Sequence, residues 1–171
     1  RGGSVGFPKK NIYPLLNRPL MSYPLLAAKY SNYVDEVYVS SDSEEILNVG
    51  KDLWAKTISR PSELATSEAT IESAFLHGYE YIKKDCGQEI ELLVILMCNA
   101  VSVLPKTIDR GVETLRSNKI FDSAVTVSGY NMFSPIRARK ITEDGSLAPF
   151  VPFENCNFKI DSHRQKQDAV Y

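Results

Sequence analysis

The chain reads Val34-Asp35-Glu36-Val37-Tyr38-Val39-Ser40 and then Ser41-Asp42-Ser43-Glu44-Glu45. The first run is rich in β-branched and aromatic residues, which predicts a strand. The second run offers residues that cap helices, and we expect Asp42 to be the N-cap. One apolar helix face follows, formed by Ile46, Leu47, Val49 and Leu53. A strand that leads through a short polar loop into a helix is a building unit of α/β folds.

The same alternation continues on both sides of this unit. The run Leu92–Met97 is apolar throughout, which predicts a strand buried on both faces of a parallel sheet. Further predicted strands are 56–59 and 122–128, and the predicted helices are 20–28, 71–82 and 107–117. Strands that alternate with helices predict one domain over residues 1–171, with a mainly parallel sheet between helices on both faces. In such folds, ligands bind beyond the carboxyl ends of the strands.

Composition and charge exclude several classes of protein. With 171 residues, 43% hydrophobic residues and a net charge of −1, the chain has no basic footprint for nucleic acid. It has no apolar run of membrane-spanning length and no signal peptide pattern, and its three cysteines form no CxxC pair. We therefore expect a cytoplasmic protein. The chain opens on a loop with no strand before it, so we also expect a fragment that lacks the first strand and the C-terminal part.

The opening loop, residues 1–11, has the composition of an anion-binding segment. It holds three glycines, begins with Arg1 and ends with Lys10 and Asn11. Glycine lets a ligand approach the backbone closely, and successive amides can form a nest for phosphate oxygens. On composition alone, a loose terminus is an equal alternative. The loop lacks both the Walker A spacing and the GxGxxG fingerprint, which disfavours a dinucleotide-dependent oxidoreductase.

The loop pattern R-G-G-S-x-G-x-P-x-K-N resembles the signature of the acylneuraminate cytidylyltransferases, with Val5 where the family usually has lysine. The segments 17–20, 37–46, 60–65 and 69–70 are similar to further motifs of that family, in its order. The resemblance implies a Rossmann-like three-layer α/β/α nucleotidyltransferase fold. It also implies an enzyme that joins CTP to a nine-carbon sugar acid, works as a homodimer and uses Mg²⁺, with metal ligands beyond residue 171.

The resemblance also assigns roles to residues. It implies that Arg1 and Lys10 are catalytic. The nucleotide-binding residues that it implies are Arg1, Gly2, Gly3, Ser4, Gly6, Lys10, Asn11, Arg60, Ala69 and Thr70. The sugar-binding residues are Cys98, Asn99, Arg137, Arg164 and Gln165. The run from Cys98 to Leu104 differs from the family's Q-P-T-S-P-L loop, so the choice of sugar stays open.

Each assignment has a simpler alternative. Arg60 could be a surface residue in an extended turn, Thr70 could only cap the following helix, and Cys98 could be a small buried side chain. Arg164 could be a solvated charge. Two further functions stay open for the whole chain: a nucleotidyltransferase with another sugar or base, and a non-catalytic nucleotide-binding domain.

Overall fold

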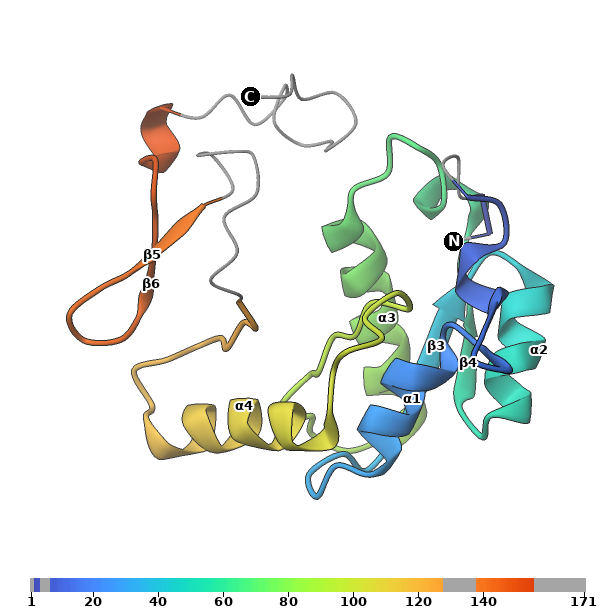
Figure 1. The fold of residues 1–171 in the computed structure, drawn as a ribbon, viewed down its shortest axis with the longest axis horizontal. Helices are drawn as coiled ribbons and strands as arrows, with labels where there is room; N and C mark the ends of the chain where they lie inside the picture. Colours follow the sequence, from blue (N-terminus) through green and yellow to red (C-terminus); the bar gives the residue numbers. More distant parts are fainter. Residues whose placement is uncertain (1, 4–6, 128–137, 156–171) are drawn as a thin grey trace. The chain divides into compact units, whose positions relative to one another are not determined.

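The computed structural model describes residues 2–3, 7–127 and 138–155 (Figure 1). The chain divides into two compact units, Arg1–Thr126 and Val127–Tyr171. The first unit contains the predicted strand–helix–strand unit. Strand β3 (Tyr38–Ser41) pairs in parallel with β4 (Lys56–Ser59), in the register Tyr38↔Lys56 to Ser41↔Ser59. Helix α2 (Glu44–Asp52) connects them, which confirms the α/β class that the alternating pattern predicts.

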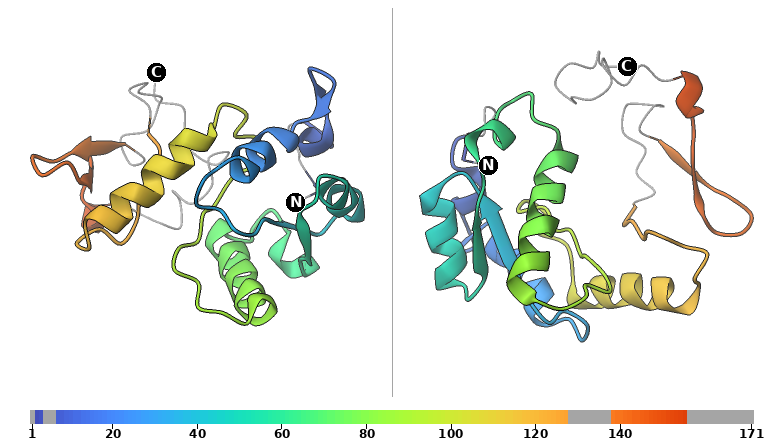
Figure 2. Two further views of the ribbon diagram at one scale, coloured as in Figure 1. Left: turned by 90° about the horizontal axis from the view of Figure 1, so that it is seen from below. Right: turned by 180° about the vertical axis from the view of Figure 1, so that it is seen from behind.

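The two strands lie between two helices. Helix α2 packs against β3 and β4, and α3 (Ile71–Cys86) lies on the opposite side (Figures 1 and 2). Polar contacts also join α3 to the strands, because the Tyr38 hydroxyl donates to Asp85 at 2.7 Å and Lys56 lies 3.2 Å from the same carboxylate. This is the three-layer order expected from the sequence.

Apolar side chains of α1, α2 and the strands form the core of the first unit. One buried cluster consists of Met21, Leu25, Val39, Ile46 and Ala55. A second cluster joins helix α1 (Ser22–Lys29) to helix α4 (Pro105–Ser117) through Ala27, Ala28 and Ile108. The helices predicted over 20–28 and 107–117 are therefore confirmed, with their apolar faces directed inward.

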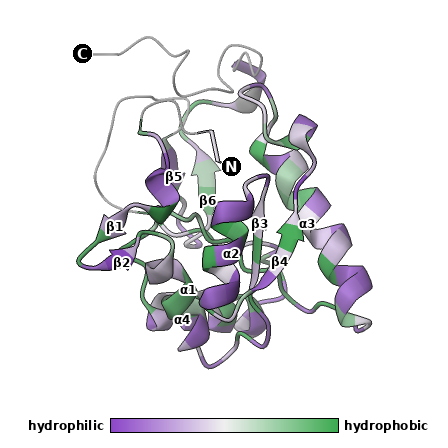
Figure 3. Cartoon of the chain, turned by 90° about the vertical axis from the view of Figure 1, so that its right-hand side faces the viewer, coloured by the Kyte–Doolittle hydropathy of each residue, from purple (hydrophilic) through white to green (hydrophobic). Residues whose placement is uncertain are grey.

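Helix α3 follows its sequence pattern closely. Thr70 is the N-cap, and its hydroxyl accepts a hydrogen bond from the Ser73 amide at 3.3 Å. Gly87 ends the helix with φ of 59°, a conformation that glycine adopts without steric cost. Figure 3 shows hydrophobic and hydrophilic bands alternating along the helix, as expected for an amphipathic segment.

A short hairpin precedes α1. The 3₁₀ turn η1 (Lys10–Ile12) leads into β1 (Pro14–Leu15), which pairs antiparallel with β2 (Arg18–Pro19). The two turn residues, Leu16 and Asn17, both have positive φ, 49° and 64°. This is the backbone of a two-residue hairpin turn, in which asparagine is favourable and leucine is not.

Three predictions about local structure are wrong. Residues 92–97 and 122–127 are described without strand structure, and Leu93, Val94 and Ile95 are 40–47% exposed. A strand needs a neighbour whose backbone groups face its own, and the described residues supply none for either segment. The third error is the Asp42 cap, because Ser43 occupies the N-cap position of α2 and makes no side-chain capping bond.

The second unit contains another hairpin. Strand β5 (Arg139–Ile141) pairs antiparallel with β6 (Leu147–Pro149), followed by the 3₁₀ turn η3 (Phe153–Asn155). The Asp144 carboxylate accepts hydrogen bonds from the Thr142 hydroxyl and the Ser146 side chain and amide in the connecting turn. These bonds lower the pKa of Asp144 to about 2, with the Thr142 hydroxyl as the largest cause.

Candidate active site

Polar residues gather where β3 and β4 end. The strands run in parallel, so the segments that follow them, Asp42–Ser43 and Arg60, leave the same edge of the sheet. The Arg60 amide donates to the Ser41 carbonyl at 2.9 Å, which continues the pairing one step past β4. Both segments therefore lie at the carboxyl edge of the strand pair, where ligands bind in such folds.

Arg60 is fixed at this edge by its own guanidinium group. Its Nη2 donates to the Ser40 carbonyl at 2.8 Å and its Nε donates to the Ser40 hydroxyl at 3.2 Å. Burial lowers the pKa of Arg60, while the Asp42 carboxylate raises it. Arginine keeps its charge under these conditions. The half-buried guanidinium is therefore a positive group anchored on the strand, and its contact with a nucleotide stays a prediction.

Gly2 meets the same edge from the opening loop. Its amide donates to Asp42 Oδ1 at 2.8 Å. A Cβ atom added to Gly2 would lie 2.9 Å from Ser43 Cβ, closer than real side chains approach. The close approach of the two backbones therefore requires glycine here, whereas a Cβ on Gly3 would meet nothing within 4 Å.

The two lysines of the loop differ in their surroundings. Lys9 has φ of 55° and forms an ion pair with Glu45 at 2.9 Å. Both side chains are exposed, so this pair contributes about 0–1 kcal/mol. Lys10 has no ion pair with any residue that the structure describes. The backbone next to it is anchored, because the Met21 amide donates to the Asn11 carbonyl at 2.8 Å.

Cys98 reaches the site from a different part of the chain. It packs against the core cluster of Met21 and Val39, and its thiol interacts electrostatically with Arg60. Burial raises the pKa of Cys98, so the thiol is protonated at neutral pH. This environment agrees with the simpler alternative, a small buried side chain. Asn99 follows in an exposed turn.

Ala69 and Thr70 make local contacts next to the start of α3. Thr70 caps α3, as its simpler alternative predicts, and the Ala69 amide donates to the Thr66 hydroxyl at 3.0 Å. No described hydrogen bond joins either residue to Arg60. Six predicted site residues lie outside the described residues: Arg1, Ser4, Gly6, Arg137, Arg164 and Gln165.

Three residues to which the sequence assigned no role in the site complete it. Ser40 holds Arg60, Asp42 holds Gly2, and Glu45 holds Lys9. The acidic pair Glu44-Glu45 opposite a loop with two lysines is a charge pattern that suggests such contacts. The partner of Asp42 leaves no local signal, because Gly2 lies 40 residues away in the chain.

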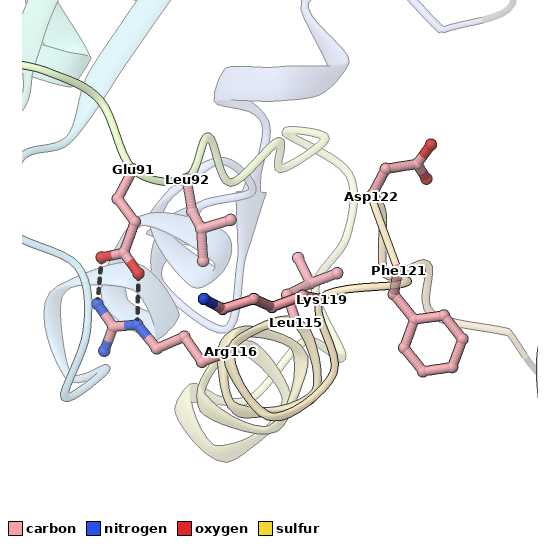
Figure 4. Close-up of a pocket in the computed structure, with 7 residues that line it drawn as sticks. All are labelled: Glu91, Leu92, Leu115, Arg116, Lys119, Phe121 and Asp122. Carbon is pink, nitrogen blue, oxygen red and sulfur yellow. Dashed lines mark hydrogen bonds and ion pairs between the residues drawn. The ribbon is translucent and has the colours of Figure 1, made fainter.

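A separate hollow of about 250 Å³ lies beside the C-terminal end of α4. Figure 4 shows the bidentate Glu91–Arg116 ion pair on one side of it, Phe121 and Asp122 on the other, and Lys119 between them. None of the residues that line it belongs to the β3–β4 edge, and Arg116 is already neutralised by Glu91.

Among the residues that the structure describes, no group of three or more His, Cys, Asp and Glu side chains could hold a metal ion. The Mg²⁺ that the resemblance implies stays a prediction. None of the described helices has the length and apolar character needed to span a membrane.

Comparison with known proteins identifies relatives of the chain. A family model described as cytidylyltransferase matches residues 1–141. A Helicobacter pylori protein named pseudaminic acid cytidylyltransferase and UDP-2,4-diacetamido-2,4,6-trideoxy-beta-L-altropyranose hydrolase is 30% identical over 98% of this chain and 30% of its own length. N-acylneuraminate cytidylyltransferase A of Danio rerio is 33% identical over 74% of this chain and 28% of its own length.

The solved structures include a relative in fold. A CMP:2-keto-3-deoxy-manno-octonic acid synthetase complexed with CTP matches with a TM-score of 0.57 and 17% identity, over 69% of this chain and 45% of that one. This likeness confirms the nucleotidyltransferase fold. The chain spans about a third of the length of the curated relatives named above. From the family match and these relatives, the chain belongs to the cytidylyltransferase family.

Proposed function

We propose that the complete protein joins CTP to a nonulosonic sugar acid, of the pseudaminic or sialic acid class, and releases pyrophosphate. One observation carries this proposal. The opening loop, residues 1–11, is a glycine-rich segment that Gly2 hydrogen-bonds to the carboxyl end of β3, beside the anchored guanidinium of Arg60. The family match supports the same conclusion, because residues 1–141 of this chain match the cytidylyltransferase model.

The reaction would be a nucleotidyl transfer. The anomeric hydroxyl of the sugar attacks the α-phosphorus of CTP, a new P–O bond forms, and the bond from the α-phosphorus to the bridging oxygen breaks. The hydroxyl proton leaves to solvent, and pyrophosphate carries away the displaced electron pair. Such chemistry asks the protein mainly for positioning and for stabilisation of charge.

The site offers these two contributions from its own residues. Lys10, next to the anchored Asn11 backbone, would neutralise charge that develops toward pyrophosphate. The positive Arg60 would face the nucleotide at the strand edge. Arg1 and the amides of the glycine-rich segment would complete the triphosphate site, and Arg137, Arg164 and Gln165 would contact the sugar acid. These roles are proposals that follow from the family membership.

Three further features belong to the proposal. The complete protein would be a cytoplasmic homodimer, and it would use Mg²⁺ to neutralise phosphate charge. The described residues contain no set of metal ligands, so no step is assigned to the ion. Chelation with EDTA should abolish pyrophosphate release, and added Mg²⁺ should restore it.

The sugar would be chosen by residues near Cys98. This side chain contacts the core and interacts electrostatically with Arg60, while Asn99 lies exposed one residue further. Pseudaminic acid and N-acetylneuraminic acid should therefore be offered separately, because relatives with both names match this chain. The comparison of their rates of pyrophosphate release assigns the sugar.

Replacing Lys10 tests the role of the loop. Lys10→Ala should lower turnover by roughly 10²–10³-fold, since a charged contact made in the transition state is lost. The measurement is pyrophosphate release by the complete protein with CTP and the sugar acid. Lys51→Ala, an exposed lysine in the last turn of α2, is the matched control and should keep its turnover.

Two outcomes would contradict the proposal. Near-normal turnover in Lys10→Ala would remove the catalytic role from this loop. Tight binding of CTP without pyrophosphate release, whichever sugar acid is offered, would favour a non-catalytic nucleotide-binding domain. Two features of this chain support that alternative: Val5, where the family usually has lysine, and the altered loop from Cys98 to Leu104.

A further inference from the structure

We propose that Asp42 is a positioning residue, which holds Gly2 and therefore the start of the glycine-rich segment against the carboxyl end of β3. The inference rests on the proposed function, because it concerns how the same site is prepared for a triphosphate. It assigns to Asp42 a role other than helix capping or contact with the substrate.

The first argument is the bond itself. The Gly2 amide donates to Asp42 Oδ1 at 2.8 Å, the length of a charge-assisted hydrogen bond. Because this amide is already paired, it is not open to a phosphate oxygen. The function of Gly2 is then to dock the segment, and binding of phosphate falls to other amides.

The second argument is that Asp42 stands on a rigid turn. Ser41 is 1% exposed, and its hydroxyl accepts a hydrogen bond from the Ser43 amide at 3.1 Å. This bond spans Asp42 from one side to the other, so its backbone is fixed between β3 and α2. A carboxylate on a fixed backbone holds its partner with little loss of entropy on binding.

The third argument is complementarity of shape. Gly2 lies so close to Ser43 that an added Cβ would be 2.9 Å from Ser43 Cβ and 3.5 Å from its hydroxyl. The hydrogen bond and the close contact involve neighbouring residues, Asp42 and Ser43. The hydrogen bond to Asp42 and the contact with Ser43 together fix the position of Gly2.

The fourth argument is charge. A carboxylate beside a triphosphate would ordinarily weaken its binding. Here Asp42 interacts electrostatically with the guanidinium of Arg60, which Ser40 holds on the same strand. The positive charge of Arg60 offsets the negative charge of Asp42. Asp42 can therefore hold Gly2 without repelling the nucleotide.

The first experiment needs no nucleotide. In the complete protein labelled with ¹⁵N-glycine, the Gly2 amide resonance should move in Asp42→Ala, because the hydrogen-bond acceptor is lost. In Asp42→Asn it should stay near the wild-type position, because the amide oxygen of asparagine still accepts the bond. A Gly2 amide resonance that is identical in the wild-type protein and in Asp42→Ala would overturn the proposal, whether or not the protein proves to be an enzyme.

The second experiment separates positioning from catalysis. Asp42→Ala should raise the KM for CTP on the order of tenfold, as expected for loss of a charged hydrogen bond, with a smaller change in kcat. Asp42→Asn should recover most of the affinity, because its carbonyl oxygen still accepts the Gly2 amide. An unchanged KM in Asp42→Ala, in a wild-type background that is active, would overturn the inference and leave the proposed function intact.

The third experiment tests the close contact with a double-mutant cycle. Gly2→Ala should raise the KM for CTP, and adding Ser43→Gly should restore it, because the clashing Cβ is removed. Gly111→Ala in α4 is the control for the glycine substitution, since its Cβ would meet nothing within 4 Å. Additive effects of the two site substitutions would show that Gly2 does not dock on Ser43.

Discussion

Single residues of this chain show how backbone contact decides what a position tolerates. Gly50 lies inside α2, where glycine ordinarily weakens a helix. A Cβ added there would lie 3.1 Å from the Cβ and Cγ2 atoms of Val39, a buried residue of β3. Glycine is therefore retained because α2 packs tightly against the strand.

Replacement of Gly50 should destabilise the protein. We expect Gly50→Ala to lower the free energy of unfolding by about 1 kcal/mol, since overpacking outweighs the gain in helix propensity. Gly111→Ala, which adds its Cβ in open space, should instead raise it by about 0.5–1 kcal/mol. Urea unfolding measures both, and equal stabilisation by the two substitutions would contradict the packing argument.

Asp42 gives a second lesson at this scale. A serine and aspartate run between a strand and a helix predicts a cap at Asp42, and α2 begins one residue later than that cap implies. The aspartate side chain nevertheless points to Gly2, because the loop supplies an amide at 2.8 Å. A local sequence pattern predicts contacts between residues that are close in the chain. It does not predict a hydrogen bond to a partner 40 residues away.

At the scale of elements, the hairpin before α1 contains a strained residue. Leu16 has φ of 49° in the turn between β1 and β2 and is 82% exposed. For a residue with a Cβ atom this conformation costs about 1–2 kcal/mol of free energy, and the cost is smaller for asparagine. The turn of the hairpin, and not a contact of the side chain, sets this cost.

Relief of this strain should stabilise the chain. Leu16→Asn should raise the free energy of unfolding by about 1 kcal/mol, as the left-handed conformation becomes less costly. The matched variant Leu16→Val should lower it, because a β-branched residue fits this conformation worse than leucine. Thermal unfolding compares the three proteins, and a less stable Leu16→Asn would show that the exposed leucine contributes a contact.

Helices and strands differ in how far they could be predicted. The amphipathic period and the Thr70 cap predict α3, since a helix satisfies its hydrogen bonds within one segment. The apolar run Leu92–Met97 predicts a strand, yet the described residues provide no strand beside it. Apolar composition favours burial of a segment. A strand also needs a neighbouring backbone to which its N–H and C=O groups can hydrogen-bond.

At the scale of the first unit, a polar contact joins the segment that follows α1 to α4. The Asp109 carboxylate accepts the Ser31 hydroxyl at 2.5 Å, and the Asn32 amide and side chain at 3.0 Å and 2.7 Å. These bonds, that of Ser31 first, hold the pKa of Asp109 below its ordinary value. The buried Ile108 beside it contacts Ala27 and Ala28 of α1.

The contact implies a definite dependence on pH. A carboxyl group whose pKa is lower in the folded state stabilises the fold above its unfolded pKa, about 3.9, and loses this contribution as pH falls. Asp109→Asn should therefore be less stable than the wild type at pH 7, and the difference should shrink below about pH 4. Urea unfolding at several pH values measures it.

The α/β class, the β3–α2–β4 unit and the amphipathic helices could be predicted from the amino-acid pattern, as could the resemblance of the opening loop to cytidylyltransferases. These properties depend on periodicity, propensity and motifs within short segments. Packing of the folded chain is what places Gly2 on Asp42 and Ser43, pairs Lys9 with Glu45 while Lys10 has no described ion pair, and anchors Arg60 on Ser40. The reason is physical: each of these contacts joins residues far apart in the chain, and their geometry exists only once the strands and helices have packed.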